Sequence, residues 1–274
     1  MAHNTSKIKN IAFYLSMAVF SILILVCEIW RTEIFGEGQL AEDLYLMSTR
    51  VIGSILCLIL IFFCDMKHLL GIRGTGFGRA VLFTLPCWLI ALNNFPIIPY
   101  FTGGVYIKAD ASDILFYALQ CLCVGIFEEF AFRGCVFTMV LQNRRKSTKD
   151  IFWAIVISSA VFGVVHLMNI FVGASPVSVI LQIGYSFLIG GMCSVVLMKT
   201  GSLWHCALLH GVYNFCGGVV PRLGGGNIWD APTVILTVIV SLAVATYVII
   251  SFLRITPEDI GYMFNEDKNK LKTE

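Results

Sequence analysis

The stretch ILFYALQCLCVGIFEEFAFRGCVFTMVL, residues 114–141, is apolar enough to cross a bilayer, yet it carries two glutamates and an arginine. A run of about 20 predominantly apolar residues is typical of a transmembrane helix. Ionised side chains inside such a helix are costly, and they usually face a bundle interior or water, where they serve a function. Glu128, Glu129 and Arg133 therefore bear on both the fold and the function.

The rest of the chain repeats this apolar pattern. Of its 274 residues, 58% are hydrophobic and 13% are charged, whereas roughly a quarter of the residues of a soluble domain are charged. Apolar runs recur from end to end, which predicts an all-α, polytopic membrane bundle of about eight transmembrane helices in one domain, residues 1–274. The predicted spans are 11–30, 50–64, 80–101, 113–142, 151–171, 177–199, 202–219 and 232–254.

Lys and Arg residues indicate the orientation, because cytoplasmic loops carry an excess of them. With the N-terminus in the cytoplasm, 14 of these residues fall inside and four outside the membrane. The pattern predicts that both termini are cytoplasmic, and we expect an integral, multi-pass protein of a bacterial cytoplasmic membrane. The four outside residues are Arg31, Arg50, Lys108 and Arg222.

Net charge and cysteine content exclude two other classes of protein. A formal charge of +2, with no basic patch outside the loops, gives no support for a nucleic-acid partner. Nearly all of the ten cysteines fall inside apolar runs. They are therefore interpreted as small hydrophobic residues and not as a disulfide framework.

The three charged residues of the fourth predicted span have different partners available. Glu129 and Arg133 are four residues apart, so they share a helix face and can pair. Glu128 points about 100° away from Glu129 and needs another partner or a catalytic role. The alternative is that the trio is a buried polar knot that holds helices together. Glu28 lies near a helix end, where it can reach the interface.

Polar residues in two other spans fall at a similar depth. FGVVHLMN, residues 162–169, contains His166 with Asn169 as a supporting residue, and WHCALLHGVYNF, residues 204–215, contains His210 and Asn214. From the cytoplasmic helix ends, these residues lie about 22 Å (His166), 12 Å (His210) and 18 Å (Asn214) deep, and Glu128 about 21 Å. We therefore expect them to converge in one layer, with His205 excluded because it lies near the interface.

This set of side chains suits the hydrolysis of an amide or ester. A carboxylate beside an imidazole can activate water, and a second imidazole with an amide can donate hydrogen bonds to an oxyanion. Two histidines and a glutamate are also zinc ligands, and the residues alone leave both possibilities open. Neither HExxH nor GxSxG occurs in the chain.

Three motifs occur in order on separate predicted helices: EEFAFR (128–133), FGVVH (162–166) and HGVYN (210–214). They fit the patterns EExxxR, FxxxH and HxxxN. With them the chain resembles the CPBP intramembrane proteases, which include the type II CAAX prenyl endopeptidases and the bacteriocin-processing and immunity proteins. The resemblance covers about residues 113–219, which we expect to form the motif-bearing catalytic core.

The resemblance implies an intramembrane endopeptidase in which glutamate activates water. Glu128 is then the general base, aided by His166, while His210 and Asn214 stabilise the oxyanion. Supporting roles fall to Glu129, Arg133, Phe162 and Asn169. The resemblance implies no metal, and the lesser option is a zinc-dependent peptidase with Glu128, His166 and His210 as ligands.

Two readings of the function stay open at this point. The first is the endopeptidase, acting on a membrane-associated peptide or protein. In a bacterial host, peptide pheromones, bacteriocin precursors and lipidated peptides are the substrates that the resemblance favours over prenylated CAAX proteins. The second is a non-catalytic membrane protein, an immunity factor or a transport partner, which uses the same polar cluster for binding.

Overall fold

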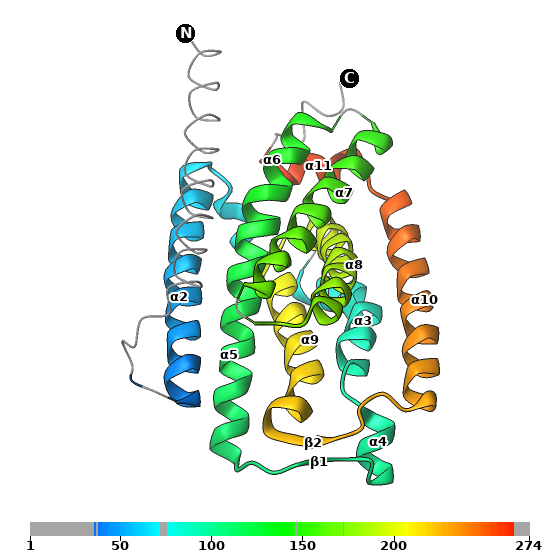
Figure 1. Ribbon diagram of the computed structural model, residues 1–274. Helices are drawn as coiled ribbons and strands as arrows, with labels where there is room; N and C mark the ends of the chain where they lie inside the picture. The colour runs from blue at the N-terminus through cyan, green and yellow to red at the C-terminus, as the bar shows by residue number, and fades with distance from the viewer. Residues whose placement is uncertain (1–35, 37, 72–75, 146, 172, 266–274) are drawn as a thin grey trace.

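The computed structural model describes residues 36, 38–71, 76–145, 147–171 and 173–265 (Figure 1). The predicted first span, residues 11–30, and Glu28 lie outside them. Within them the chain is a bundle of long helices with one small antiparallel sheet, in which Val105 pairs with Gly226. The sheet lies at one end of the bundle, and α6 and α11 lie at the other.

The elements follow one another with short connections. The α-helices are α2 (Gln39–Phe63), α3 (Phe77–Asn93), α4 (Ile97–Thr102), α5 (Ala111–Glu129), α6 (Thr138–Asn143), α7 (Thr148–Val165), α8 (Pro176–Thr200), α9 (Leu203–Leu223), α10 (Ala231–Leu253) and α11 (Pro257–Met263). Two short 3-10 helices are η1 (Lys67–Leu70) and η3 (His166–Ile170), and η2 (Phe130–Phe137) is a π-helix. The strands are β1 (Val105–Ile107) and β2 (Gly224–Gly226).

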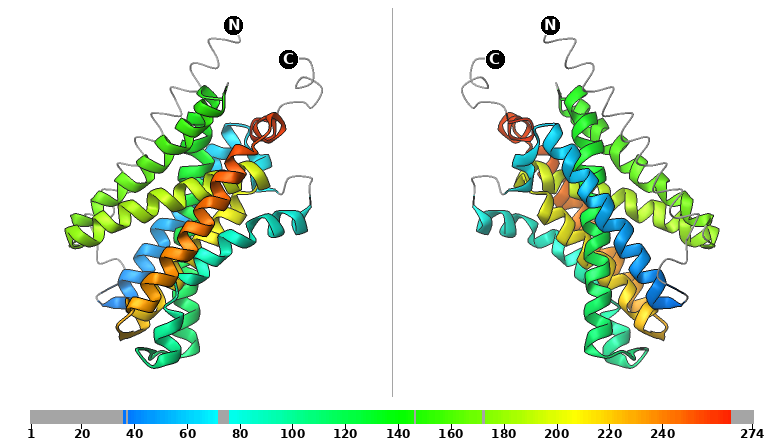
Figure 2. Two further views of the ribbon diagram at one scale, coloured as in Figure 1. Left: turned by 90° about the vertical axis from the view of Figure 1, so that its right-hand side faces the viewer. Right: turned by 90° about the vertical axis from the view of Figure 1, so that its left-hand side faces the viewer.

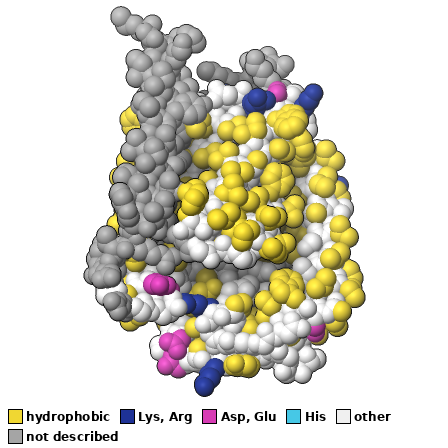
Figure 3. Space-filling view, in the orientation of Figure 1, with side chains coloured by type: hydrophobic (Ala, Val, Ile, Leu, Met, Phe, Trp, Pro, Cys, Tyr) yellow, Lys and Arg dark blue, Asp and Glu magenta, His cyan; other side chains and the backbone are white. Residues whose placement is uncertain are grey.

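The protein is a polytopic helical membrane protein. Among the described residues, five helical segments are long and apolar enough to cross a membrane: Gln39–Phe63, Ala111–Asn143, Thr148–Ile170, Pro176–Thr200 and Ala231–Leu253. Large apolar side chains are exposed along them, as lipid contact requires. Figure 3 shows a hydrophobic middle, with charged side chains towards the two ends.

Two predicted spans differ from the helices that form. The span predicted at 50–64 is part of α2, which begins at Gln39. The first turns of α2 contain Asp43, whose charge is satisfied inside the bundle. Asp43 pairs with Arg222 of α9 and accepts a hydrogen bond from Gln120 of α5 at 3.0 Å. The span predicted at 80–101 ends at Asn93, and the chain restarts as α4 after Pro96.

Side chains that cap helix N-termini set where several helices begin. Asp110 and Asp113 form a capping box at the start of α5, and Ser175 caps α8 just before a proline. Hydrogen bonds from the Ser112 hydroxyl and the Asp113 amide lower the pKa of Asp110. The cap fixes the residue at which α5 begins, so Glu128 and Glu129 fall in the last turn of that helix.

Helix α5 lies at the centre of the described bundle and packs most extensively against α9. Helices α7 and α8 pack on each other to one side, and α3 lies on the opposite side (Figure 2). The core between them is built from large buried side chains of η2 and its neighbours, including Phe130, Phe137 and Leu209. The charged residues of α5 and η2 therefore lie inside this packing.

Candidate active site

Two glycines let α5 and α9 approach each other closely. A Cβ atom on Gly125 of α5 would lie 2.6 Å from the carbonyl oxygen of Ala207 and 2.7 Å from the amide nitrogen of Gly211, both in α9. Small residues permit such backbone contact between membrane helices. The glutamate pair follows Gly125 by one turn, and His210 precedes Gly211. The crossing therefore brings the glutamates against this histidine.

The helix changes type directly after the glutamate pair. Helix α5 ends at Glu129, and the π-helix η2 starts at Phe130. Within η2, a Cβ atom on Gly134 would lie 2.9 Å from the Ile61 side chain, so the wide turn packs tightly on α2. π-helical turns are rare and occur frequently at functional sites. Nothing in the apolar periodicity of the sequence predicts this one.

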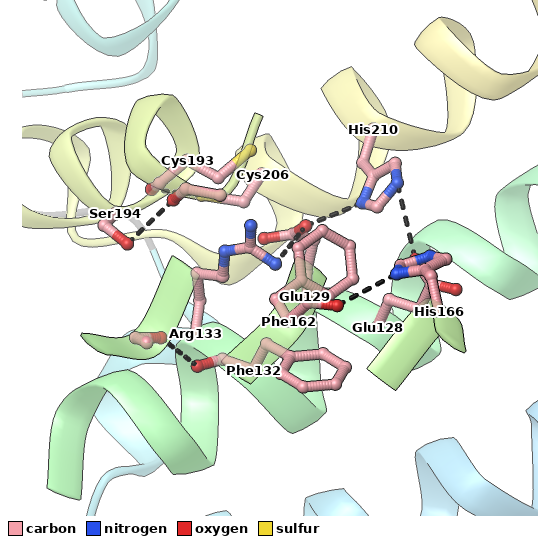
Figure 4. Close-up of polar contacts among 12 residues, drawn as sticks. Glu128, Glu129, Phe132, Arg133, Phe162, His166, Cys193, Ser194, Cys206 and His210 are labelled. Carbon is pink, nitrogen blue, oxygen red and sulfur yellow. Dashed lines mark hydrogen bonds and ion pairs between the residues drawn. The ribbon is translucent and has the colours of Figure 1, made fainter. Parts of the chain in front are cut away.

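Glu129 is the buried centre of the polar cluster (Figure 4). Its oxygen Oε1 lies 2.7 Å from Nδ1 of His210 and 3.0 Å from a terminal guanidinium nitrogen of Arg133. The side chains of Glu129 and Arg133 are 0% and 1% exposed. The pair predicted from their spacing is confirmed, and Glu129 also binds His210, which the sequence did not indicate.

The bond to Glu129 limits the protonation states of His210. A carboxylate that is paired with arginine accepts hydrogen bonds and does not donate them, so Nδ1 of His210 carries the hydrogen. The other ring nitrogen, Nε2, lies 3.5 Å from Oε2 of Glu128. The Glu128 side chain is 16% exposed. One imidazole thus faces two neighbouring carboxylates, of which Glu129 is buried and fixed and Glu128 is accessible.

Phe162 of α7 links the two histidines. Its ring makes edge contacts with the rings of His166 and His210, with centroid distances of 5.1 and 5.8 Å. The guanidinium carbon of Arg133 lies 4.4 Å from the Phe162 ring centroid, in a cation–π arrangement. One aromatic ring therefore packs against three polar members of the cluster.

His166 has a hydrogen-bond partner that orients its ring. Its Nδ1 lies 2.9 Å from the backbone carbonyl oxygen of Phe162. A carbonyl oxygen only accepts, so Nδ1 donates, and Nε2 of the neutral ring is left as an acceptor. His166 can therefore accept a hydrogen bond from water at Nε2.

These groups have the properties required for water activation. A general base must lie within hydrogen-bond reach of the proton that it removes, directly or through one water molecule. Glu128 is the accessible carboxylate, His166 offers an acceptor nitrogen, and His210 is held in place by a buried ion pair. Such preorganised donors and acceptors stabilise charge that develops during a reaction.

Other residues singled out in the sequence make contacts of their own. Asn214 lies one turn beyond His210 on α9. The Asn169 amide donates to Gln182 at 2.7 Å, which ties η3 to α8, and the His205 ring contacts Phe77 at a centroid distance of 5.9 Å. Asn214 lines a cavity of about 310 Å³ with Gln39, Asp43, Leu46, Tyr117, Gln120, Cys121, Val124 and Arg222.

The zinc ligands named from the sequence do not form a compact set. In the described part of the chain, one group of three His, Cys, Asp or Glu side chains has its ligand atoms within 4.8 Å of one another. This group is Glu129, Cys193 and Cys206. Glu128, His166 and His210 are outside it, apart from the contact between His210 and Glu128 described above.

Two features near the glutamates carry no signal in the sequence. Tyr185 of α8 interacts electrostatically with Glu128, and its ring lies 6.1 Å from that of Tyr213 of α9. Cys193 and Cys206 lie beside Glu129. A tyrosine or cysteine inside an apolar run has the pattern of an ordinary core residue, so only the arrangement of the helices identifies them.

Comparison with known proteins agrees with the motifs and with the geometry. The family model described as type II CAAX prenyl endopeptidase Rce1-like matches residues 110–216, which run from the start of α5 into α9 and include both glutamates and both histidines of the cluster. The search of the curated proteins and that of the solved structures gave no match. Residues 110–216 of this chain therefore form a domain of the Rce1-like type II CAAX prenyl endopeptidase family.

Proposed function

We propose that the protein is an intramembrane endopeptidase in which Glu128 activates water to hydrolyse a peptide bond. The observation that carries the proposal is the asymmetry of the glutamate pair. Glu129 is fully buried and held by Arg133 and His210, whereas Glu128 is partly accessible and faces His210 across 3.5 Å. Family membership supports the same reaction class.

The proposed reaction needs no group beyond these side chains and water. Ionised Glu128 removes a proton from water that also donates a hydrogen bond to Nε2 of His166, and the water oxygen attacks the carbonyl carbon. The protonated Glu128 then transfers its proton to the departing amide nitrogen as the C–N bond breaks. This use of one group as base and then as acid is ordinary general acid–base catalysis.

His210 stabilises the oxyanion in this proposal. Its Nδ1–H is bound to Glu129, so a proton on Nε2 makes the ring an imidazolium with a second N–H donor on the side of Glu128. With both glutamates ionised and Arg133 charged, this imidazolium leaves the cluster without net charge, which lowers the cost of burying it. The amide of Asn214, one turn farther along α9, is proposed as a second oxyanion donor.

We propose a membrane topology of eight spans with both termini in the cytoplasm. The seven predicted spans within the described residues all correspond to helices, of which α3 is shorter and α9 more polar than the five long apolar segments. The excess of Lys and Arg on one set of loops gives the direction. The substrate is proposed to be a membrane-associated peptide or a lipidated one.

The experiment compares the membrane peptides of cells that express the native chain, Glu128→Gln or Glu258→Gln at equal protein level. Glu258 is an exposed carboxylate of α11, so its substitution makes the same chemical change outside the site. We expect a peptide that the native chain and the Glu258 variant cut and that the Glu128 variant leaves intact. Identical profiles, with a cellular phenotype retained by Glu128→Gln, would favour the non-catalytic binding role.

A further inference from the structure

A second cluster of reactive side chains lies behind the proposed active site. Cys193 of α8 and Cys206 of α9 have their sulfur atoms within 4.8 Å of each other and of a Glu129 carboxylate oxygen. Figure 4 shows both cysteines on the side of Glu129 away from His210. The three residues come from three different helices and are each 0% exposed.

One carboxylate oxygen of Glu129 has no hydrogen-bond partner among the described residues. Its Oε1 serves both His210 and Arg133, whereas Oε2 is buried and has no hydrogen-bond partner among the described residues. Leaving a buried acceptor unsatisfied costs roughly 1–3 kcal/mol, and more when the group is charged. An orphan oxygen beside two thiols is therefore a position where a ligand would be stabilising.

Two thiols and a carboxylate are a ligand set for zinc. Zn²⁺ binds cysteine sulfur at about 2.3 Å and carboxylate oxygen at about 2.0–2.2 Å in tetrahedral geometry. Ligand atoms around such an ion lie roughly 3.6–3.8 Å from one another. The three atoms, now within 4.8 Å, need to close by about 1 Å at most, which side-chain rotation achieves.

Charge balance favours a divalent ion over a monovalent one. Without metal, the Glu129–Arg133 pair and two neutral thiols carry no net charge. Zn²⁺ displaces the two thiol protons, so its charge is balanced by two thiolates and the cluster stays neutral. A monovalent ion keeps the cluster neutral only if it displaces one proton, so it would be bound by one thiolate and one thiol, whereas a divalent ion uses both sulfur atoms as thiolates.

We infer that Glu129, Cys193 and Cys206 form a binding site for Zn²⁺, with the fourth position taken by water or by the neighbouring backbone carbonyl of Cys193. That carbonyl already accepts a hydrogen bond from the Cys206 thiol at 3.3 Å, so it faces the same space. The site differs from the glutamate–histidine set that would hold a catalytic zinc. The inference does not rest on the proposed peptidase activity, because binding is measured without substrate.

The chain contains a matched control for the thiol pair. Cys57 of α2 and Cys135 of η2 also form a buried pair of neighbouring thiols between two helices. In the described residues, no carboxylate or histidine joins them in a three-ligand group. If thiols alone governed binding, the two pairs would behave alike, whereas the inference requires the pair beside Glu129 to be the one that binds.

The test uses the purified full chain in detergent, kept reduced and freed of metal, and titrated with Zn²⁺. We expect one tightly bound zinc per native chain, and X-ray absorption of that native complex should show two sulfur ligands at about 2.3 Å. Cys193→Ser and Cys206→Ser should each weaken binding by more than the roughly 10–100-fold that loss of an outer-shell partner costs. The double variant Cys57→Ser/Cys135→Ser should bind as the native chain does.

Three results would overturn the inference. The first is a folded, reduced native chain that retains no zinc. The second is a zinc shell of nitrogen and oxygen only, which would point to the glutamate and histidines of the active site. The third is equal loss of binding in the control pair. The absorption measurement needs no variant, so it stays decisive if a cysteine substitution prevents folding.

Discussion

An added methyl group at Gly125 should disturb the crossing of α5 and α9 on which the polar cluster depends. Its Cβ atom would lie 2.6 Å from the Ala207 carbonyl oxygen, where ordinary contact begins at 3.4 Å. In Gly125→Ala the two helix backbones must therefore separate locally by about 0.8 Å, because backbone atoms cannot rotate away as a side chain can. The helix propensity of alanine opposes this cost by about 1 kcal/mol.

The separation acts directly on the polar cluster one turn away. A shift of about 0.8 Å would lengthen the 2.7 Å bond between Glu129 and His210 to about 3.5 Å, beyond hydrogen-bond range. Overpacking of this kind costs typically about 1–3 kcal/mol of stability. A misplacement of about 1 Å costs on the order of 100-fold in rate. We therefore expect a modest loss of stability with a much larger loss of cleavage.

Both quantities can be measured beside a matched glycine. Gly184 of α8 is also helical, and a Cβ atom there meets no atom within 4 Å. Gly184→Ala should leave thermal unfolding in detergent and cleavage of the identified peptide unchanged or slightly improved. If Gly125→Ala unfolds and cleaves like the native chain, the close α5–α9 approach is not what holds His210 on Glu129, and the reasoning fails.

Three further variants test the parts of the cluster separately. Arg133→Gln strands the buried charge of Glu129 and should cost about 3–5 kcal/mol in detergent unfolding. The double variant Glu129→Gln/Arg133→Gln should cost clearly less, and equal losses would contradict a buried ion pair. Tyr185→Phe removes the hydroxyl that interacts electrostatically with Glu128, and it should slow cleavage while shifting stability by less than about 0.5 kcal/mol; an unchanged rate would exclude Tyr185 from the reaction. Phe162→Leu should lower the stability by about 0.5–2 kcal/mol through the lost cation–π contact, and it should also slow cleavage. An unchanged cleavage rate would mean that the Phe162 ring does not hold the two histidines in position.

Apolar periodicity predicted most of the bundle, and it failed where polar residues point inward. The prediction starts this span at residue 50 and leaves the preceding turns of α2, with Glu42 and Asp43, in a loop outside the membrane. In the structure Asp43 pairs with Arg222 of α9, so its charge is satisfied inside the bundle. Arg50 is likewise within α2 and lies over the Phe127 ring at 5.3 Å, which is not an exposed loop position.

Helix depth was a poor guide to which polar residues meet. Counting from the helix ends placed Glu128 deeper than His210, yet the two side chains approach to 3.5 Å. The count assumed that the two helix ends lie at one level. The α5 segment continues through η2 and α6 to Asn143, 15 residues beyond Glu128, whereas α9 begins at Leu203, only seven residues before His210. Spacing within one helix did predict the Glu129–Arg133 pair. The relative orientation of α9 and α5, which places His210 in contact with Glu129, depends on tertiary packing that no local sequence pattern encodes.

The position of Glu129 also has a consequence for how the chain is made. Arg133 follows it by four residues, but His210 is 81 residues farther on. At about 5–20 residues per second, α9 leaves the ribosome roughly 4–16 s after α5. A lone charge near the centre of a helix resists membrane insertion by about 2.5–3.5 kcal/mol, so pairing with Arg133 lowers the cost of inserting Glu129 before His210 has been synthesised. The nascent chain therefore carries both glutamates in the membrane without His210, and a chain that stops before α9 leaves the proposed active site unassembled.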